Sequence, residues 1–190
     1  MFGGLIMILF EYRKPLNGLV VANVNTIDTL YLHHTGNDNN ILENTDYQMD
    51  LSPEKFAWLA YGMYYVDGKE YWVRGYENIN AGVKHHNGHG VSLVIQGNYD
   101  YKPPEEYDLI NLEKRILQLK RDLPNLKYIK GHNEDFPTEC PGHFFPMERF
   151  RKLLRTDETL DERFLTKKEF RIFLDGYKLQ KKRMYRYINK

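Results

Sequence analysis

The sequence predicts an α/β fold, in which a central mixed β-sheet is flanked by helices and a helical extension follows at the C-terminal end. Short apolar runs rich in β-branched and aromatic residues alternate with amphipathic helical patterns through residues 1–155. That alternation is typical of a sheet covered by helices. The composition changes at about Arg155, where a polar stretch leads into a helical pattern and a basic end. We therefore expect one domain at 1–155 and a basic helical extension at 156–190.

The overall composition narrows the classes of protein that fit. The chain has 190 residues, 42% of them hydrophobic, and a formal net charge of +1. This length and apolar content can build a packed core, and the near-neutral charge argues against a nucleic-acid-binding protein. A single cysteine excludes a scaffold held together by internal disulfides.

The first strand-like segment is Met1–Phe10, which is mostly apolar. It lacks the basic start and the cleavage site of a signal peptide, and it is too short to span a bilayer. We expect it to form an edge strand or an arm packed on the core.

Further segments have the composition of strands, namely 26–34, 63–66, 70–74, 91–95 and 128–130. The first alternates along its length and is expected in the interior of the sheet. An Asp-Gly pair separates the second from the third and predicts a hairpin. The fourth is almost continuously apolar, which predicts a strand buried on both faces.

A helix is expected to begin at Ser52, because a hydroxyl cap is followed there by a proline and an acidic residue. That helix would turn Phe56, Leu59 and Ala60 inward. The preceding segment 36–45 is rich in Asn, Gly and Asp, so a loop is expected.

Three later segments carry helical signals. The segment 105–123 places apolar side chains on one helical face, at Leu109, Leu112, Ile116, Leu119 and Leu123. A short amphipathic helix is expected over 147–154. A capping box begins at Thr166 and starts the helix of the extension.

The most informative chemistry surrounds Cys140, in a segment 131–142 that reads Gly-His-Asn-Glu-Asp-Phe-Pro-Thr-Glu-Cys-Pro-Gly. His132 lies where a strand passes into this loop, and an earlier strand ends in His33 and His34. Two imidazoles and one thiolate supply three zinc ligands and leave one tetrahedral position open. A vacancy of this kind is typical of catalytic zinc sites, whereas structural sites are closed by four protein ligands.

Other interpretations of these residues stay open at this stage. Adjacent residues of a strand point to opposite faces, so one of His33 and His34 would be a hydrogen-bonded core imidazole. Cys140 could be an incidental buried thiol or a nucleophile paired with His132. His143 is a weak candidate for a fourth ligand, which would close the site into a structural one.

Several other residues could take part in such a site. Tyr61 precedes the hairpin, and the Thr138 hydroxyl could donate to a developing oxyanion or cap the turn. His85, His86 and His89 lie in a loop rich in Gly and Asn; we expect one at the rim of the site and the others in solvent. The sequence has no phosphate-binding Gly-rich loop, nucleophile elbow or His-Glu-x-x-His helix.

Four segments together resemble the type-2 N-acetylmuramoyl-L-alanine amidases, a family that includes phage lysozyme-like amidases and peptidoglycan-recognition proteins. They are Leu-His-His-Thr at 32–35, Tyr61, Gly-Val-Ser-Leu-Val at 90–94 and the segment 131–142. The resemblance covers roughly residues 25–155, and the last segment is the most specific.

The resemblance implies a zinc enzyme of the peptidoglycan-recognition fold that hydrolyses the amide between N-acetylmuramic acid and L-alanine in peptidoglycan. It implies that His33, His132 and Cys140 bind the zinc and that Tyr61 and Thr138 are catalytic. The alternative is a non-catalytic peptidoglycan-binding module of the same fold. Such relatives generally lack the cysteine ligand, so Cys140 favours the enzyme.

The remaining expectations concern partners and location. We expect a monomer that acts as a phage or prophage endolysin, stays in the cytoplasm until host lysis and binds peptidoglycan but no nucleic acid. The basic end of 156–190 would either attract anionic wall polymers or membrane head groups or pack as an ordinary amphipathic helix on the core.

Overall fold

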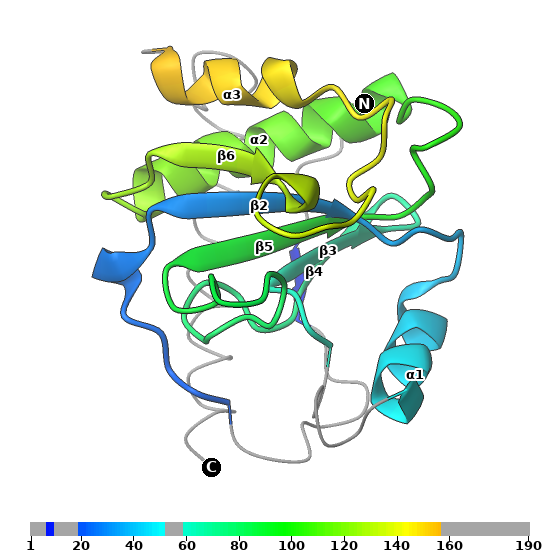
Figure 1. Cartoon of the computed structure of the whole chain (residues 1–190), viewed down its shortest axis with the longest axis horizontal. Coiled ribbons are helices and arrows are strands. Elements are labelled where there is room, and N and C mark those ends of the chain that lie inside the picture. Colours follow the sequence, from blue (N-terminus) through cyan, green and yellow to red (C-terminus); the bar gives the residue numbers. More distant parts are fainter. Residues whose placement is uncertain (1–6, 10–18, 52–58, 157–190) are drawn as a thin grey trace.

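A computed structural model describes residues 7–9, 19–51 and 59–156 of the chain. Its strands form one six-stranded sheet (Figure 1). The strands are β1 Met7–Leu9, β2 Thr29–His34, β3 Met63–Val66, β4 Lys69–Trp72, β5 Gly90–Ile95 and β6 Tyr128–Gly131. The helices are α1 Ile41–Leu51, α2 Glu106–Asp122 and α3 Met147–Arg155, with 3-10 turns η1 at Val24–Thr26 and η2 at His132–Glu134.

The strand order is β1-β4-β3-β5-β2-β6, and the sheet is mixed. β3 and β4 form the antiparallel hairpin that the Asp-Gly turn predicts, with Asp67 at a φ of 51° and Gly68 at 67°. The other neighbouring pairs are parallel. β1 lies at the edge of the sheet, which confirms an edge strand within Met1–Phe10.

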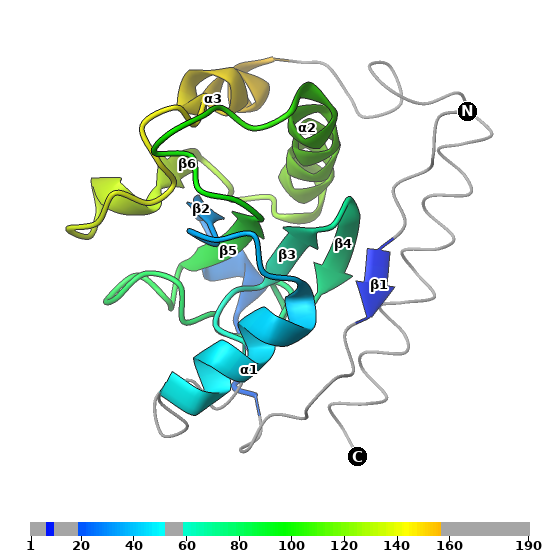
Figure 2. The same cartoon turned by 90° about the vertical axis from the view of Figure 1, so that its right-hand side faces the viewer.

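Helices cover the sheet on both faces. In Figure 2 the pair α2 and α3 lies on one side of the strands and α1 on the other. Leu30 and Leu32 of β2 pack in the core beneath α2 and α3, whereas Tyr64 of β3 and Val94 of β5 pack in a second cluster with Ile41 of α1. The alternation of strand side chains therefore supplies two cores, and the predicted α/β class with a central mixed sheet is confirmed.

The central strands and α2 follow the sequence closely. Every residue of β5 is buried, as its continuous apolar run predicts, and β2 lies inside the sheet between β5 and β6. The five apolar residues expected on one face of α2 and at its end are all buried, with at most 6% of any side chain exposed.

The prediction of a loop over 36–45 is wrong for the second half of that segment, because the helix α1 begins at Ile41. Its start is fixed by a capping box. The Oδ1 of Asn40 accepts hydrogen bonds from the backbone N–H groups of Leu42 and Glu43, and the Glu43 carboxylate accepts one from the N–H of Asn40. Satisfying these otherwise unpaired groups stabilises a helix start.

The helix start expected at Ser52 and the position of Phe56 lie outside the described residues. Leu59 and Ala60 are buried as expected, but they lie outside any helix. The extension and its predicted helix also lie outside the described residues. Within the parts of the chain that are described, no helix has the length and apolar character needed to cross a membrane.

Candidate metal centre

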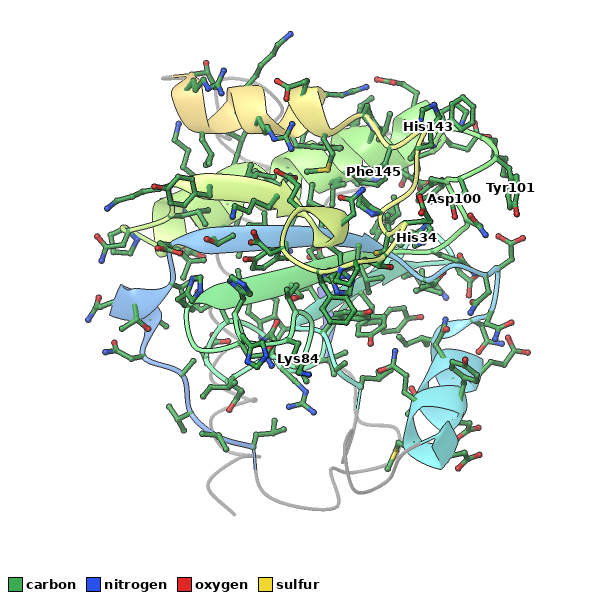
Figure 3. All side chains as sticks on the ribbon, viewed as in Figure 1. His34, Lys84, Asp100, Tyr101, His143 and Phe145 are labelled. Atoms are coloured by element: carbon green, nitrogen blue, oxygen red, sulfur yellow. The ribbon has the colours of Figure 1, made fainter. Side chains whose placement is uncertain are left out.

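The two histidines at the end of β2 point to opposite faces of the sheet. His33 is completely buried. On the other face, the Nδ1 of His34 accepts a hydrogen bond of 3.2 Å from the backbone N–H of Tyr99. Figure 3 shows His34 near Asp100, on the side where the segment of His143 and Phe145 runs. His34 is thus a half-buried, hydrogen-bonded imidazole on the face away from His33.

The second imidazole follows β6 directly, on η2. Glu134 holds this turn in place, because its Oε1 accepts a hydrogen bond of 2.5 Å from the N–H of Gly131 and one of 2.6 Å from Arg151 of α3. The strands β2 and β6 are parallel neighbours. His33 and His132 therefore emerge at the same edge of the sheet.

The loop after η2 folds back to bring Cys140 to this edge. The N–H of Asn133 donates a 2.8 Å hydrogen bond to the carbonyl of Cys140, and the N–H of Gly142 donates one of 2.7 Å to Glu139. The backbone N–H of His34 also lies 3.4 Å from the Cys140 sulfur. These backbone contacts fix the thiol against the end of β2.

One potential ligand atom from each of His33, His132 and Cys140 lies within 4.8 Å of the others. The Nδ1 of His33 is 3.7 Å from the Sγ of Cys140, and the His33 and His132 rings are 4.7 Å apart between centroids. Cys140 is only 8% exposed. The structure therefore brings together the three residues that the sequence analysis combined.

The pKa shifts at the cluster indicate two neutral imidazoles. Burial lowers the pKa of His33 well below its usual value, helped by His132 and His34. Burial and His34 also lower the pKa of His132, so both rings are neutral and have a free lone pair at neutral pH. Burial raises the pKa of the Cys140 thiol to about 12. A nucleophile and a zinc ligand must both be the thiolate, so deprotonation of Cys140 requires a nearby positive charge such as a bound cation.

The donor set fits zinc. Two neutral imidazoles and a cysteine thiolate are ligands that zinc prefers, and three protein ligands with one open position define its catalytic geometry. His143 does not belong to this cluster; it is exposed, and its ring contacts Phe144.

Tyr61 and Thr138 lie beside the cluster. The ring of Tyr61 is 4.4 Å from that of His33 between centroids. Burial and the neighbouring Cys140 raise the pKa of Tyr61, so its phenol stays protonated. The hydroxyl of Thr138 accepts a 3.3 Å hydrogen bond from the N–H of Cys140, which is the turn-capping contact considered from the sequence.

The histidines of the 84–90 loop do not join the cluster. His89 binds Asp28 at 2.9 Å, and His86 lies 3.9 Å from Asp135. His85 is exposed, as expected for a solvated residue.

The sequence analysis did not identify Ser92 of β5 as part of the site. Its Oγ lies 3.2 Å from the Nε2 of His33, and only 2% of the residue is exposed. The available signal was a polar residue in an otherwise apolar strand.

Solved structures similar to this chain include amidases and peptidoglycan recognition proteins. The N-acetylmuramoyl-L-alanine amidase LysC from Clostridium intestinale URNW is 19% identical, with a TM-score of 0.66, and the match covers 80% of this chain and 98% of LysC. The endolysin amidase LysCS from the same organism is 18% identical, with a TM-score of 0.66 and coverage of 82% and 100%.

A third similar structure contains the peptidoglycan recognition proteins LCa and LCx with bound tracheal cytotoxin. The match is 19% identical, has a TM-score of 0.63 and covers 74% of this chain and 92% of that one. The chain has the fold shared by these amidases and recognition proteins, which confirms at the level of the fold the resemblance drawn from the sequence. The sequence matches no family model and no curated protein.

Proposed function

We propose that this protein is a zinc-dependent N-acetylmuramoyl-L-alanine amidase that cleaves peptidoglycan, in the role of a phage or prophage endolysin. The observation that carries the proposal is the convergence of His33, His132 and Cys140, whose ligand atoms lie within 4.8 Å of one another. Two solved structures with the same fold are amidases, and one of them is described as an endolysin.

In the proposed reaction, the zinc ion and the side chains would have separate roles. A zinc ion held by the three ligands would polarise the scissile carbonyl and lower the pKa of a water molecule. Tyr61 would donate a hydrogen bond as negative charge develops on that carbonyl oxygen. Its protonated phenol and the contact between its ring and His33 support this role. The hydroxyl oxygen of Thr138 accepts a hydrogen bond from the N–H of Cys140. The hydroxyl proton of Thr138 would therefore remain available to donate to the substrate.

The test combines metal analysis with digestion of purified cell walls. Hydrolysis of the proposed bond adds water, freeing the amine of L-alanine and a lactyl carboxylate, with no new reducing sugar. Wild type is expected to hold one zinc and to release these amines. Cys140→Ser is expected to lose both properties, because a hydroxyl is a poor zinc ligand. His143→Ala serves as the control, and it is expected to keep both.

Each contrary outcome has a defined meaning. Full activity in Cys140→Ser would refute the ligand assignment. Wild-type protein that binds walls and zinc but releases no amines would instead be a recognition module, which is the function of the second group of similar structures. Loss of zinc in His143→Ala would indicate a closed structural site.

A further inference from the structure

Ser92 occupies a central position under the proposed metal centre. It lies on β5 directly opposite Tyr31 of β2, and its Oγ is 3.2 Å from the Nε2 of His33. The other ring nitrogen of His33, Nδ1, lies 3.7 Å from the Sγ of Cys140. The two nitrogens of this imidazole therefore face different partners, one a hydroxyl in the sheet and the other the ligand cluster.

A neutral imidazole carries one proton, and the atom that holds the proton cannot bind a metal. A histidine that binds a metal ion does so as the neutral imidazole. If Nε2 carries the proton, it donates to the Ser92 hydroxyl and leaves the Nδ1 lone pair directed toward Cys140. In the opposite tautomer, the Nδ1 proton would point toward the thiol and no lone pair would face the cluster.

We infer that Ser92 is a positioning residue that fixes the tautomer and the orientation of His33, so that Nδ1 is its metal-binding atom. This inference rests on the metal centre of the proposed function and adds a residue to it. Metal-binding histidines commonly donate their second N–H to such an outer partner, which also holds the plane of the ring. Ser92 itself is buried, so it acts through His33.

The backbone around Ser92 is held in place as a positioning role requires. Its N–H donates a 2.8 Å hydrogen bond to the Oδ1 of Asn80, and its carbonyl accepts one of 3.1 Å from the N–H of Gly62. The Asn80 amide nitrogen in turn donates to the carbonyls of Gly75 and Asn78 at 2.9 and 2.8 Å. These bonds anchor the serine to the loop that follows β4 and to the residue that precedes β3.

The space beside the hydroxyl is also restricted. A Cβ added at Gly82 would overlap the Oγ of Ser92, so the loop approaches the hydroxyl as closely as a glycine permits. The hydroxyl is enclosed between this loop and His33. We therefore expect it to have little freedom to leave the imidazole.

The first test measures zinc affinity by competition with a chelator, without reference to enzymatic activity. Ser92→Ala removes only the hydroxyl, and it is expected to weaken zinc binding about 10–100-fold, the range typical for loss of an outer partner. Thr29→Val is the matched control. Its hydroxyl is also buried in the sheet but bonds Asp28, so its removal is expected to leave zinc affinity unchanged.

The second test reads the tautomer directly in zinc-loaded wild-type protein. A ¹H–¹⁵N correlation spectrum of the imidazoles is expected to show the His33 Nε2 protonated and its Nδ1 without a proton. This measurement remains decisive even if Ser92→Ala fails to fold.

Two results would overturn the inference while leaving the proposed function intact. One is zinc-loaded wild type with the proton on the Nδ1 of His33. The other is a folded Ser92→Ala protein with wild-type zinc affinity. Failure of the proposed function looks different, because wild-type protein would then either bind no zinc at this site or bind zinc and release no amines from cell walls.

Discussion

At the scale of the residue, the site depends on burial. His33 is fully enclosed, and burial keeps its ring and that of His132 neutral. The same burial keeps the Tyr61 phenol protonated. Burial therefore favours the protonation states that the proposed function requires, neutral imidazoles with lone pairs for a metal and a protonated phenol that can donate a hydrogen bond.

Tyr61→Phe separates these two roles. The change removes one donor and leaves the ring that packs on His33, so we expect the rate of amide hydrolysis to fall about 10²–10³-fold. Zinc affinity and thermal stability are expected to stay close to wild type. Rates on purified walls and a zinc titration measure the two effects, with Tyr128→Phe as a control because Tyr128 is 52% exposed on β6. A parallel loss of zinc in Tyr61→Phe would contradict a purely catalytic role.

At the scale of the element, the ends of strands and helices place the functional groups. His33 comes from the end of β2, His132 from the turn after β6, and Cys140 from a loop pinned by backbone hydrogen bonds. Because β2 and β6 are parallel, their carboxyl ends meet at one edge, where open α/β sheets commonly bind ligands. α1 covers the opposite face from α2 and α3, packing Ile41 and Met49 against β3 and β5.

The start of α1 provides a test of the fold. Asn40→Ala removes the acceptor for two backbone N–H groups, so we expect the free energy of unfolding to fall by about 1 kcal/mol. Asn40→Asp keeps an oxygen acceptor and is expected to stay within a few tenths of a kcal/mol of wild type. Urea denaturation measures both. Equal stability of the two variants would show that the cap contributes nothing.

Periodicity predicted most of these elements. The β2 and β5 runs, the hairpin and α2 are long or regular enough for their patterns to identify them. α1 was missed because its Asn- and Asp-rich start is typical of loops; its capping signal is the Asn40–Glu43 spacing. The three proposed ligands were predicted because the motif around Cys140 is specific. Ser92 was not, because its role depends on β5 lying beside β2, and one sequence does not specify strand neighbours.

At the scale of the whole molecule, a single sheet carries both cores and the candidate centre. The helices α2 and α3 stabilise one face, and Arg151 of α3 reaches Glu134, which holds the turn of His132. The packing of α3 therefore contributes to the position of His132, a proposed metal ligand. The division at residue 155 and the role of the basic extension stay predictions, since 157–190 lie outside the described residues.

The most direct measurement is an anomalous difference map of zinc-loaded crystals, recorded at the zinc absorption edge. We predict one strong peak at the end of β2 and β6. It should lie about 2.0–2.1 Å from the Nδ1 of His33 and from one ring nitrogen of His132, and about 2.3 Å from the Sγ of Cys140, with no fourth protein ligand. A peak bound elsewhere, or a fourth side chain closing the sphere, would contradict the account.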